Sequence, residues 1–406
     1  MQSRELDVLI VGGGLVGGSL ALALAQTGVD VALVDAPMPS SVAGAPADPR
    51  KLALSAASLN ALGALGVLSR LAGPPTPIRR IHASRAGDFG RVVLEAAELG
   101  REALGGVVLA GDLARALGDA VAAAGVPTVR GRVDADGFEE GVRRAVVRTA
   151  DGEAPWRARL VVAADGTGSP WRQAAGIDTD EYDYGQTLVV TSMRVDHRPD
   201  GTAWERLTDE GPCALLPMAD GWHGALCGVA SESVDAVAAL DDAGYADYFQ
   251  RRFGWRAGRI RAVGARSLWP LRRVVAQRLA AERLVLVGNA AQTLHPIGAQ
   301  GFNLGLRDAL TIAGLIGDAR ATDAAADPGD AALLREHEAR RRVDREATLA
   351  FSDGLARFSA GGSFIHHALR SVGLLALAAD PGLRATIAAG AMGFRGHVPA
   401  LAREVA

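Results

Sequence analysis

The sequence predicts an α/β (α+β) protein with three parts: a domain built on a parallel sheet, a second domain with a mixed or antiparallel sheet, and a helical C-terminal region. A glycine-rich strand–helix–strand unit at the start predicts the first part. A stretch of short strands without strand–helix alternation predicts the second, and a long run of helical patterns predicts the third. The 406 residues also exceed the roughly 250–300 residues at which a single core stops growing.

The opening unit has the pattern of a dinucleotide-binding fold. Residues 6–11 form an apolar run suited to a buried parallel strand. Residues 19–26 follow as a helix of small side chains, and residues 29–34 as a second strand that ends at Asp35. A glycine-rich motif framed by two strands, a helix and a terminal acid is far more specific than the motif alone.

Three glycines and one carboxylate in this unit match the needs of a pyrophosphate-linked cofactor. Gly12 permits the tight turn, Gly14 lets the backbone approach the pyrophosphate, and Gly17 lets helix and strand pack closely. The helix N-terminus offers unpaired N–H groups to the anion. Asp35 stands roughly 20 residues beyond the glycines, where a carboxylate binds a ribose hydroxyl. An acid there indicates FAD or NAD rather than NADP; the alternative is a glycine-rich loop with no ligand.

Composition excludes several function classes. The net charge of -3 gives no electrostatic reason to expect a nucleic-acid partner. Cys213 and Cys227 lack metal or redox spacing, so we expect no metal site and a reducing, cytoplasmic compartment. No apolar run reaches the roughly 18 residues of a membrane span. Asp7 interrupts the apolar start, so we do not expect a signal peptide either.

Strands and helices alternate from residue 50 to residue 164 around one proline-rich linker. We expect helices at 56–65 and 112–124, a linker at 71–80, and strands at 81–94, 128–133, 142–149 and 160–164. Residues 105–109 lead into the second of these helices. The last of these strands ends in Asp165-Gly166. Ligands bind at the carboxyl ends of such strands in open α/β sheets, although an Asp-Gly pair also suits an ordinary strand-to-helix turn.

The character of the chain changes between residues 187 and 271. Short strands at 188–195, 213–218, 224–229 and 260–268 and one helix at 243–253 show no strand–helix alternation, which indicates a mixed or antiparallel sheet. A buried strand then returns at 283–287 and leads into a glycine-rich block at 288–303. The pattern continues with a helix at 304–316, a linker at 321–330, a charged helix at 331–355 and fairly apolar helices to the end.

Three separated blocks together resemble the single-component flavoprotein aromatic hydroxylases of the 4-hydroxybenzoate hydroxylase type: the opening unit, Asp165-Gly166, and residues 288–303. The run from Gly288 to Pro296, Gly-Asn-Ala-Ala-Gln-Thr-Leu-His-Pro, is similar to the ubiquinone-biosynthesis branch of hydroxylases that act on 2-polyprenyl-6-methoxyphenols, such as 2-octaprenyl-6-methoxyphenol. Asp48-Pro49-Arg50 and parts of 344–374 fit the same branch.

The resemblance spans nearly the whole chain and implies its domain organisation. It implies a Rossmann-like, three-layer FAD-binding domain made of residues 1–72, 104–176 and 278–330. A substrate domain with a mixed or antiparallel sheet would comprise residues 73–103 and 177–277. Residues 331–406 would form the C-terminal helical region.

The resemblance also implies which residues bind the cofactor. They are Gly12, Gly14, Gly17, Asp35, Arg50, Arg115, Asp165, Asn289, Gly301 and Asn303. The first four would hold the ADP half of FAD, the two arginines would reach the pyrophosphate and nearby groups, and Gly301 and Asn303 would offer backbone N–H groups to the flavin ring. Asn289 replaces an acid that binds the ribityl chain, and Gln292 replaces a histidine. Judged by its own sequence context, Arg50 suits an ordinary surface position equally well.

One departure concerns the glycine-rich loop. Gly298-Ala299 stands where the closest branch has Ala-Gly, and an alanine at a positive φ costs about 1–2 kcal/mol. Relatives of the 4-hydroxybenzoate type also have a Gly-Ala pair. We therefore expect a small difference in the shape of this loop.

The resemblance implies an FAD-dependent monooxygenase with NAD(P)H as electron donor. The reduced flavin would bind O2 as a C4a-hydroperoxide and transfer one oxygen atom to a polyprenylated phenol. A dry pocket would protect the peroxide, and we expect Leu216, Pro217 and Pro296 to line it. A phenol has a pKa of about 10, so a base would help. His295 is the candidate base; the alternative is a histidine that shapes the loop.

Other functions stay open beside this one. They include a hydroxylase of another ring position in the same pathway and a non-catalytic FAD-binding subunit of a biosynthetic complex. Two other enzyme classes fit the sequence less well. A flavin halogenase needs a catalytic lysine, and Lys51 lies in the wrong region for one. A nicotinamide dehydrogenase would share the opening unit but has no use for residues 288–303. A water-insoluble substrate implies a tunnel and contact with the inner membrane, with a ubiquinone-biosynthesis complex, or with copies of this chain. The apolar helices around 364–379 either make that contact or pack on the FAD-binding domain.

Overall fold

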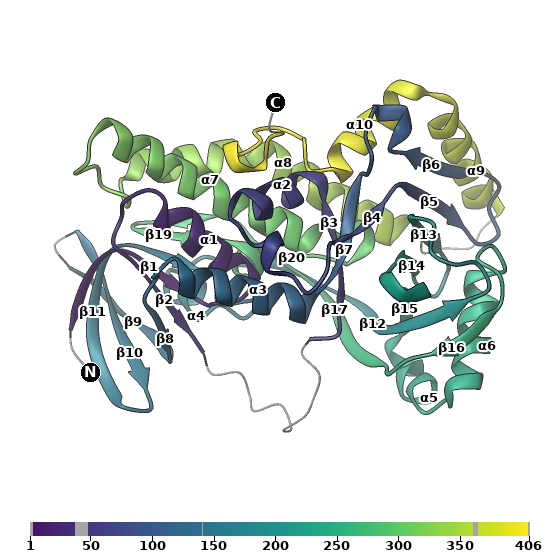
Figure 1. The fold of residues 1–406 in the computed structure, drawn as a ribbon, viewed down its shortest axis with the longest axis horizontal. Helices are drawn as coiled ribbons and strands as arrows, with labels where there is room; N and C mark the ends of the chain where they lie inside the picture. The colour runs from purple at the N-terminus through teal and green to yellow at the C-terminus, as the bar shows by residue number, and fades with distance from the viewer. Residues whose placement is uncertain (1–2, 37–47, 140, 360–363, 405–406) are drawn as a thin grey trace.

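The chain is described here by a computed structural model that covers residues 3–36, 48–139, 141–359 and 364–404. An eight-stranded sheet lies at the left of Figure 1 and a nine-stranded sheet at the right, with long helices across the upper side of the molecule. The mixture of a parallel sheet, a mixed sheet and C-terminal helices confirms the predicted fold class. The domain boundaries stay a prediction.

The first sheet is parallel at its centre. Its strand order is β18 (Ala280–Ala281), β19 (Leu284–Leu286), β11 (Gly152–Ala163), β1 (Arg4–Val11), β2 (Val31–Asp35) and β8 (Thr128–Arg130). Strands β19 to β8 are parallel, while β10 (Val142–Thr149) pairs antiparallel with β11 and with β9 (Arg132–Glu139).

Period-two alternation along the strands buries both faces of this sheet. Val8 and Ile10 point into a core shared with α1 (Leu15–Ala25), α3 (Ala110–Ala123) and α7 (Gln300–Thr322). Leu9 and Val11 point to the other face, where β9, β10 and α4 (Pro170–Ala174) cover them. The result is three layers.

The second sheet is antiparallel except for one pair. Its order is β20 (Gln292–Thr293), β17 (Ser267–Ala276), β12 (Thr179–Val195), β15 (His223–Ala230), β14 (Cys213–Pro217), β13 (Thr202–Leu207), β5 (Arg80–Arg85) and β6 (Arg91–Glu95). Strand β16 (Ile260–Val263) joins β12, and β13 pairs parallel with β5. Helices α5 (Val234–Ala238) and α6 (Asp242–Phe253) cover one face of this sheet.

A small three-stranded sheet, in the order β3 (Lys51–Ser55), β7 (Gly105–Leu109) and β4 (Thr76–Ile78), was not expected. Strand β4 falls in the segment predicted as a linker, because its prolines mask the strand pattern. Pro77 has no backbone N–H, and β4 accordingly lies at the edge of the sheet. Helix α2 (Ala56–Ala64) follows β3 directly. Ile78 and Val107 pack against Ala203 of the nine-stranded sheet, which joins the two sheets.

Two further differences from the predicted elements bear on the site. Strand β13 was not expected, because the adjacent charges of Glu205 and Arg206 break the apolar alternation. Helix α7 begins at Gln300 rather than at residue 304 and so reaches into the glycine-rich block. Short 3₁₀ turns occupy Leu68–Arg70, Ala97–Leu99, Ala219–Gly221, Ser231–Ser233, Gly288–Ala290, Ile297–Ala299 and Ala400–Ala402.

The C-terminal region consists of α8 (Ala331–Ser359), α9 (Phe364–Ala379) and α10 (Pro381–Ala391). Among the described residues no single helix is long and apolar enough to cross a bilayer. The stretches Ser371–Leu377 and Pro381–Ala391 pass that test only as a pair, bent by 89°.

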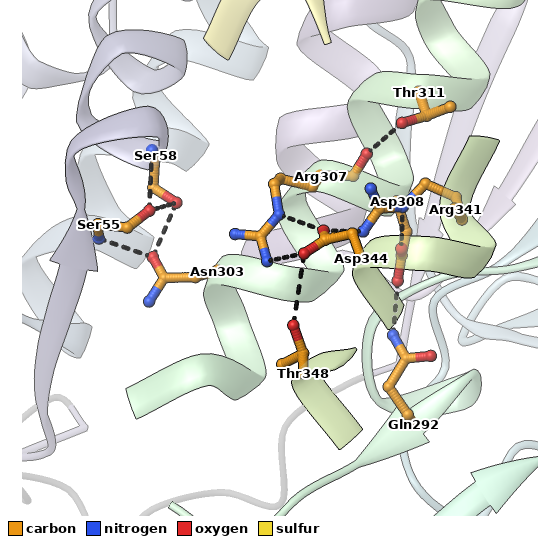
Figure 2. Close-up of polar contacts among 10 residues, drawn as sticks. All are labelled: Ser55, Ser58, Gln292, Asn303, Arg307, Asp308, Thr311, Arg341, Asp344 and Thr348. Atoms are coloured by element: carbon orange, nitrogen blue, oxygen red, sulfur yellow. Dashed lines mark hydrogen bonds and ion pairs between the residues drawn. The ribbon is translucent and has the colours of Figure 1, made fainter. Parts of the chain in front are cut away.

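A buried ionic network binds α7 to α8 (Figure 2). The carboxylate of Asp344 accepts from Arg307 at 2.7 Å and from Arg341 at 2.7 Å, and Arg341 also donates to Asp308 at 2.6 Å. All four side chains are at most 2% exposed. Burial by itself raises the pKa of Asp344, but the two guanidinium groups outweigh it and hold that pKa below its ordinary value. The network therefore stabilises the fold above the ordinary carboxyl pKa and loses strength as the pH falls through the lowered one.

Replacing Asp344 with alanine is expected to lower the free energy of unfolding by about 3–5 kcal/mol, because it leaves two buried guanidinium groups without their carboxylate. Urea denaturation measures the change. The control is Glu336→Ala, which removes an exposed ion pair with Arg340 on the same helix and should cost about 0.5 kcal/mol or less. Equal losses in the two variants would contradict the role given to the network.

Candidate functional site

The glycine turn after β1 leaves room for a ligand at one position and none at two others. A Cβ at Gly12, whose φ is +103°, would lie 2.4 Å from the carbonyl oxygen of Ala164. A Cβ at Gly17 would lie 1.9 Å from the carbonyl oxygen of Gly12. Around Gly14, in contrast, no atom lies within 4 Å of a Cβ position. Gly12 and Gly17 are therefore required by packing, and Gly14 faces open space.

Asp35 lies against this turn at the end of β2. One carboxylate oxygen accepts the backbone N–H of Gly13 at 2.8 Å, and the other forms an ion pair with Arg130 at 3.2 Å. No side chain caps the N-terminus of α1, which starts just after Gly14. The amides of that first turn and the Asp35 carboxylate thus meet at the carboxyl edge of the parallel sheet, as the sequence pattern predicts.

Asp165 follows β11 and is next to the same turn. A Cβ at Gly12 would lie 2.9 Å from the backbone nitrogen of Asp165. One carboxylate oxygen of Asp165 accepts from the backbone of Trp171 at 3.4 Å, whereas the other is buried and has no hydrogen-bond partner among the described residues. Burial raises the pKa of this carboxyl. A buried acceptor without a partner is costly, so this oxygen suits a donor group on a bound ligand.

The third block, residues 288–303, packs directly on the first two. The buried guanidinium of Arg172 donates to the carbonyl oxygens of Thr167 and Ala290, both at 2.9 Å. The hydroxyls of Thr167 and Thr293 are 2.8 Å apart. Gly288 lies against Val16 of α1, where a Cβ would come within 3.1 Å of the valine side chain. The three blocks singled out in the sequence therefore converge.

The start of α7 is held by Asn303, whose side chain is buried (Figure 2). Its oxygen accepts from the backbone N–H of Ser55 at 2.9 Å and from the hydroxyl of Ser58 at 2.7 Å. Its nitrogen donates to the carbonyl oxygens of Ala53 and Ala299. The side chain of Asn303 thus joins α7 to β3 and α2, which leaves only its backbone for a cofactor.

The N-terminus of α7 is open to a ligand. Gly301, in the first turn, has no atom within 4 Å of a Cβ position, and no side chain caps the helix. Asn289 is exposed on its 3₁₀ turn. Ala299 adopts a φ of 52° beside Gly298 at 73°, so the strained alanine expected from the Gly-Ala pair is present.

The two arginines expected at the cofactor have different surroundings. Arg50 pairs with Asp48 at 2.5 Å and lies over the ring of Trp269, 4.5 Å from its centroid, which brings it to the nine-stranded sheet. Arg115 is about half exposed on α3 and pairs there with Asp112 and Asp119. The contacts of Arg115 in the described chain do not bring it to the other site residues.

His295 is 2% exposed, and burial lowers its pKa to about 4. Its Nδ1 accepts the backbone N–H of Ile297 at 3.3 Å, and its ring meets the edge of Tyr184. In the neutral ring the proton then lies on Nε2, so neither nitrogen has a free lone pair for a base. The geometry favours the alternative that His295 shapes the loop; its role as a base stays a prediction.

Two of the three residues expected to line the substrate pocket lie on β14 of the nine-stranded sheet. Leu216 packs in the small apolar cluster with Ile78 and Val107, and its neighbour Pro217 ends β14. Their place in the wall of a substrate pocket stays a prediction. Pro296 directly precedes the turn Ile297–Ala299.

Two ionisable side chains near this apolar cluster were not predicted as site residues. Glu205 on β13 accepts a backbone hydrogen bond from Gly298, and burial raises its pKa to about 7. Lys51 on β3 packs its stem against Gly224, and burial lowers its pKa. No clear signal in the sequence points to Glu205, because Arg206 stands next to it and the two adjacent charges hide the strand.

A separate hollow of about 380 Å³ lies beside α5 and α6, on the face of the sheet that these helices cover. Residues that line it include Ala238, Asp242 and Arg266. It contains none of the predicted site residues.

Comparisons with known proteins identify the family of this chain. A family model described as an FAD binding domain matches residues 5–350. The chain is 35% identical over 363 residues to ubiquinone hydroxylase UbiL of Rhodospirillum rubrum, covering 87% of this chain and 82% of the relative. It is 32% identical to 3-demethoxyubiquinol 3-hydroxylase of Escherichia coli, covering 89% and 91%.

Solved structures show the same fold. The crystal structure of p-nitrophenol 4-monooxygenase PnpA from Pseudomonas putida matches with a TM-score of 0.75 at 19% identity, covering 98% of this chain and 99% of that one. These matches confirm the resemblance inferred from the sequence and the FAD-binding fold.

Replacing Gly14 with valine should reduce the FAD content of the purified protein at least tenfold while leaving its urea unfolding midpoint nearly unchanged. The reason is that the Cβ of the new side chain meets no atom of the described residues, whereas the side chain occupies the space through which the pyrophosphate would approach. Gly118→Ala on α3, where a Cβ also meets nothing, is the control and should keep its FAD. Full FAD content in the Gly14 variant would show that the pyrophosphate lies elsewhere.

Replacing His295 with asparagine should change the turnover number by less than tenfold. The amide oxygen of asparagine can take the place of Nδ1 and accept from Ile297, so the loop is kept. Loss of a general base would cost about 10²–10⁴ in rate. Steady-state kinetics of the FAD-loaded variant decide, and a loss in that larger range would restore the base role.

Proposed function

The chain belongs to the FAD-binding-domain family and is an FAD-dependent monooxygenase, and on that premise we propose that it hydroxylates the ring of a polyprenylated phenol of the 2-polyprenyl-6-methoxyphenol type in ubiquinone biosynthesis. One observation carries the proposal. The convergent cofactor blocks meet the nine-stranded sheet at the turn before α7, where the backbone of Gly298 donates to Glu205 of β13. The names of the relatives support a role in ubiquinone biosynthesis. The ring carbon that is hydroxylated goes beyond those names and is left to the gene-deletion experiment below.

The residues at the glycine turn would hold the ADP half of FAD. The open backbone at Gly14 suits the pyrophosphate, and the carboxylate of Asp35 suits a ribose hydroxyl. The unpaired oxygen of Asp165, the exposed amide of Asn289 and the first-turn N–H groups at Gly301 would bind the remainder. The positive end of the α7 dipole favours negative charge on a reduced flavin ring.

When bound and reduced, FAD supplies the activation of O2 and the oxygen atom that enters the ring. The chain contributes placement and exclusion of water. Leu216 and the neighbouring apolar residues of β14 and β15 would keep water from the reacting ring. NAD(P)H stays the proposed electron donor.

The C-terminal helices suit contact with a hydrophobic partner on their outer side. Val372 and Leu375 on α9 and Leu383 on α10 are 64%, 53% and 48% exposed. Leu374 and Leu377 instead pack against β6. We propose that the inner side holds these helices to the fold and that the outer side meets the membrane surface or the protein complex from which the insoluble substrate is drawn.

A direct assay tests the proposed function. The FAD-loaded protein is incubated with NADH or NADPH, isotopically labelled O2 and a short-chain prenylated methoxyphenol. The expected result is substrate-stimulated oxidation of the nicotinamide and one labelled oxygen atom in the product ring. Bound flavin without substrate-stimulated oxidation would favour the non-catalytic subunit instead.

A strain that lacks the gene separates the two hydroxylase alternatives. The proposal predicts accumulation of the methoxyphenol that lacks the new hydroxyl. Accumulation of a precursor blocked at another ring carbon would assign the chain to that later or earlier hydroxylation.

A further inference from the structure

Glu205 points to the face of the nine-stranded sheet that α5 and α6 do not cover. Trp204 and its cross-strand partner Leu215 pack in the core with α6. Successive side chains of a strand point to opposite faces. Glu205 and Leu216 therefore lie on the other face, together with Ala203, which packs against the three-stranded sheet.

The neighbours of Glu205 on this face are apolar or small. The register pairs Glu205 with Ala83 of β5 and Ala214 of β14, and it pairs Ala214 with Leu226 of β15. Leu226 in turn opposes Val190 of β12. An isolated carboxyl group in such surroundings needs a polar partner, because burying it alone is costly.

The described structure gives this carboxyl one hydrogen-bond donor, the backbone N–H of Gly298. Gly298 belongs to the turn Ile297–Ala299 that starts α7, next to the amides proposed for the flavin ring. Glu205 is thus placed where the cofactor-binding block meets the wall of the proposed substrate pocket. Glu205 as a whole is only half-buried, while the burial of its carboxyl group raises its pKa to about 7.

Other ionisable groups near this wall are engaged or held apart. Arg206 points to the opposite face and donates to Ser84. Lys51 lies over Gly224 with its stem, and the Nδ1 of His295 is occupied by Ile297. No ion pair to Glu205 occurs among the described contacts. A general base needs a free lone pair within reach of the substrate proton, and Glu205 meets this need better than His295 does.

We propose that Glu205 is a catalytic residue that hydrogen-bonds the phenol hydroxyl of the substrate and accepts its proton. The inference rests on the proposed function. The phenol O–H bond breaks, an O–H bond forms on the carboxylate, and the electron pair stays on the phenolate oxygen. That charge makes the ring a better nucleophile towards the incoming oxygen. After oxygen transfer the ring carbon loses its hydrogen as a proton to the oxygen atom that is not transferred, which restores the aromatic ring. Glu205 then returns its own proton to the product phenolate.

The decisive variant is Glu205→Gln, assayed on two substrates. Glutamine keeps the size of the side chain and an oxygen that accepts from Gly298, but it cannot take the proton. Turnover of a prenylated methoxyphenol should fall by about 10²–10⁴. Turnover of a polyfluorinated analogue that is already ionised at the assay pH should fall less than tenfold, because that substrate needs no base.

Two control variants test whether the effect is specific to Glu205 and to its carboxylate. Glu181→Gln removes an exposed carboxylate on β12 of the same sheet and should leave both rates unchanged. Glu205→Asp keeps a carboxylate and should recover part of the lost rate. Visible absorbance and urea denaturation check that each variant retains FAD and folds.

The pH profile gives a second readout. A base must be deprotonated, so kcat/KM of the unaltered enzyme should rise with pH through about 7, the pKa of Glu205. With the prenylated methoxyphenol, the glutamine variant should lose this limb and show only the ionisation of the phenol itself. With the ionised analogue, neither the unaltered enzyme nor the variant should show it, because that substrate needs no base.

The outcomes separate this role from the function on which it rests. Equal losses on both substrates, or no loss on either, would overturn the role of Glu205 while leaving the hydroxylase activity established. No turnover of either substrate by the unaltered, FAD-loaded enzyme would overturn the proposed function, and this role with it.

Discussion

The buried contact between α7 and α8 decides where the site can form. Arg307, Arg341, Asp308 and Asp344 are all removed from water, so each charge must keep its partner within hydrogen-bond distance. The amide of Gln292 enters the same network, donating to Asp308 at 2.5 Å and accepting from Arg345 at 2.8 Å. The two helices and the glycine-rich block are thereby held in one arrangement, which fixes the start of α7 beside the turn after β1.

Close packing of small residues then sets the approach of these elements. Gly305 of α7 meets Gly288 and Val16, where a Cβ would lie 2.7 Å from the Gly288 Cα. A larger side chain there would push α7 away from α1. The two helices can therefore bring two N-termini without side-chain caps to the same region. Under the proposed function, these positive dipole ends would face the pyrophosphate and the reduced ring.

Much of the cofactor side of the site is predictable from the sequence, because local backbone needs dictate its residues. Gly12 needs a positive φ, Gly17 a close approach, and Asp35 the end of a strand. The pocket side is less predictable. Glu205 lies on a strand whose pattern is masked by two adjacent charges, and its partner Gly298 is distant in the chain. Cys213 and Cys227 show the same limit. Their spacing in the sequence predicts no contact, yet the pairing of β14 with β15 places their sulfur atoms 3.4 Å apart.

By itself, the sequence determined the fold class, the dinucleotide turn and the family resemblance, since periodicity, glycine positions and short motifs act over a few neighbouring residues. Only the tertiary structure decided which polar groups form hydrogen bonds with one another and which have no partner. It committed the side chain of Asn303 to Ser55 and Ser58, occupied the Nδ1 of His295, and left one oxygen of Asp165 without a partner among the described residues. The physical reason is that hydrogen bonding and burial depend on groups from distant segments, and these meet only when the sheets and helices have packed.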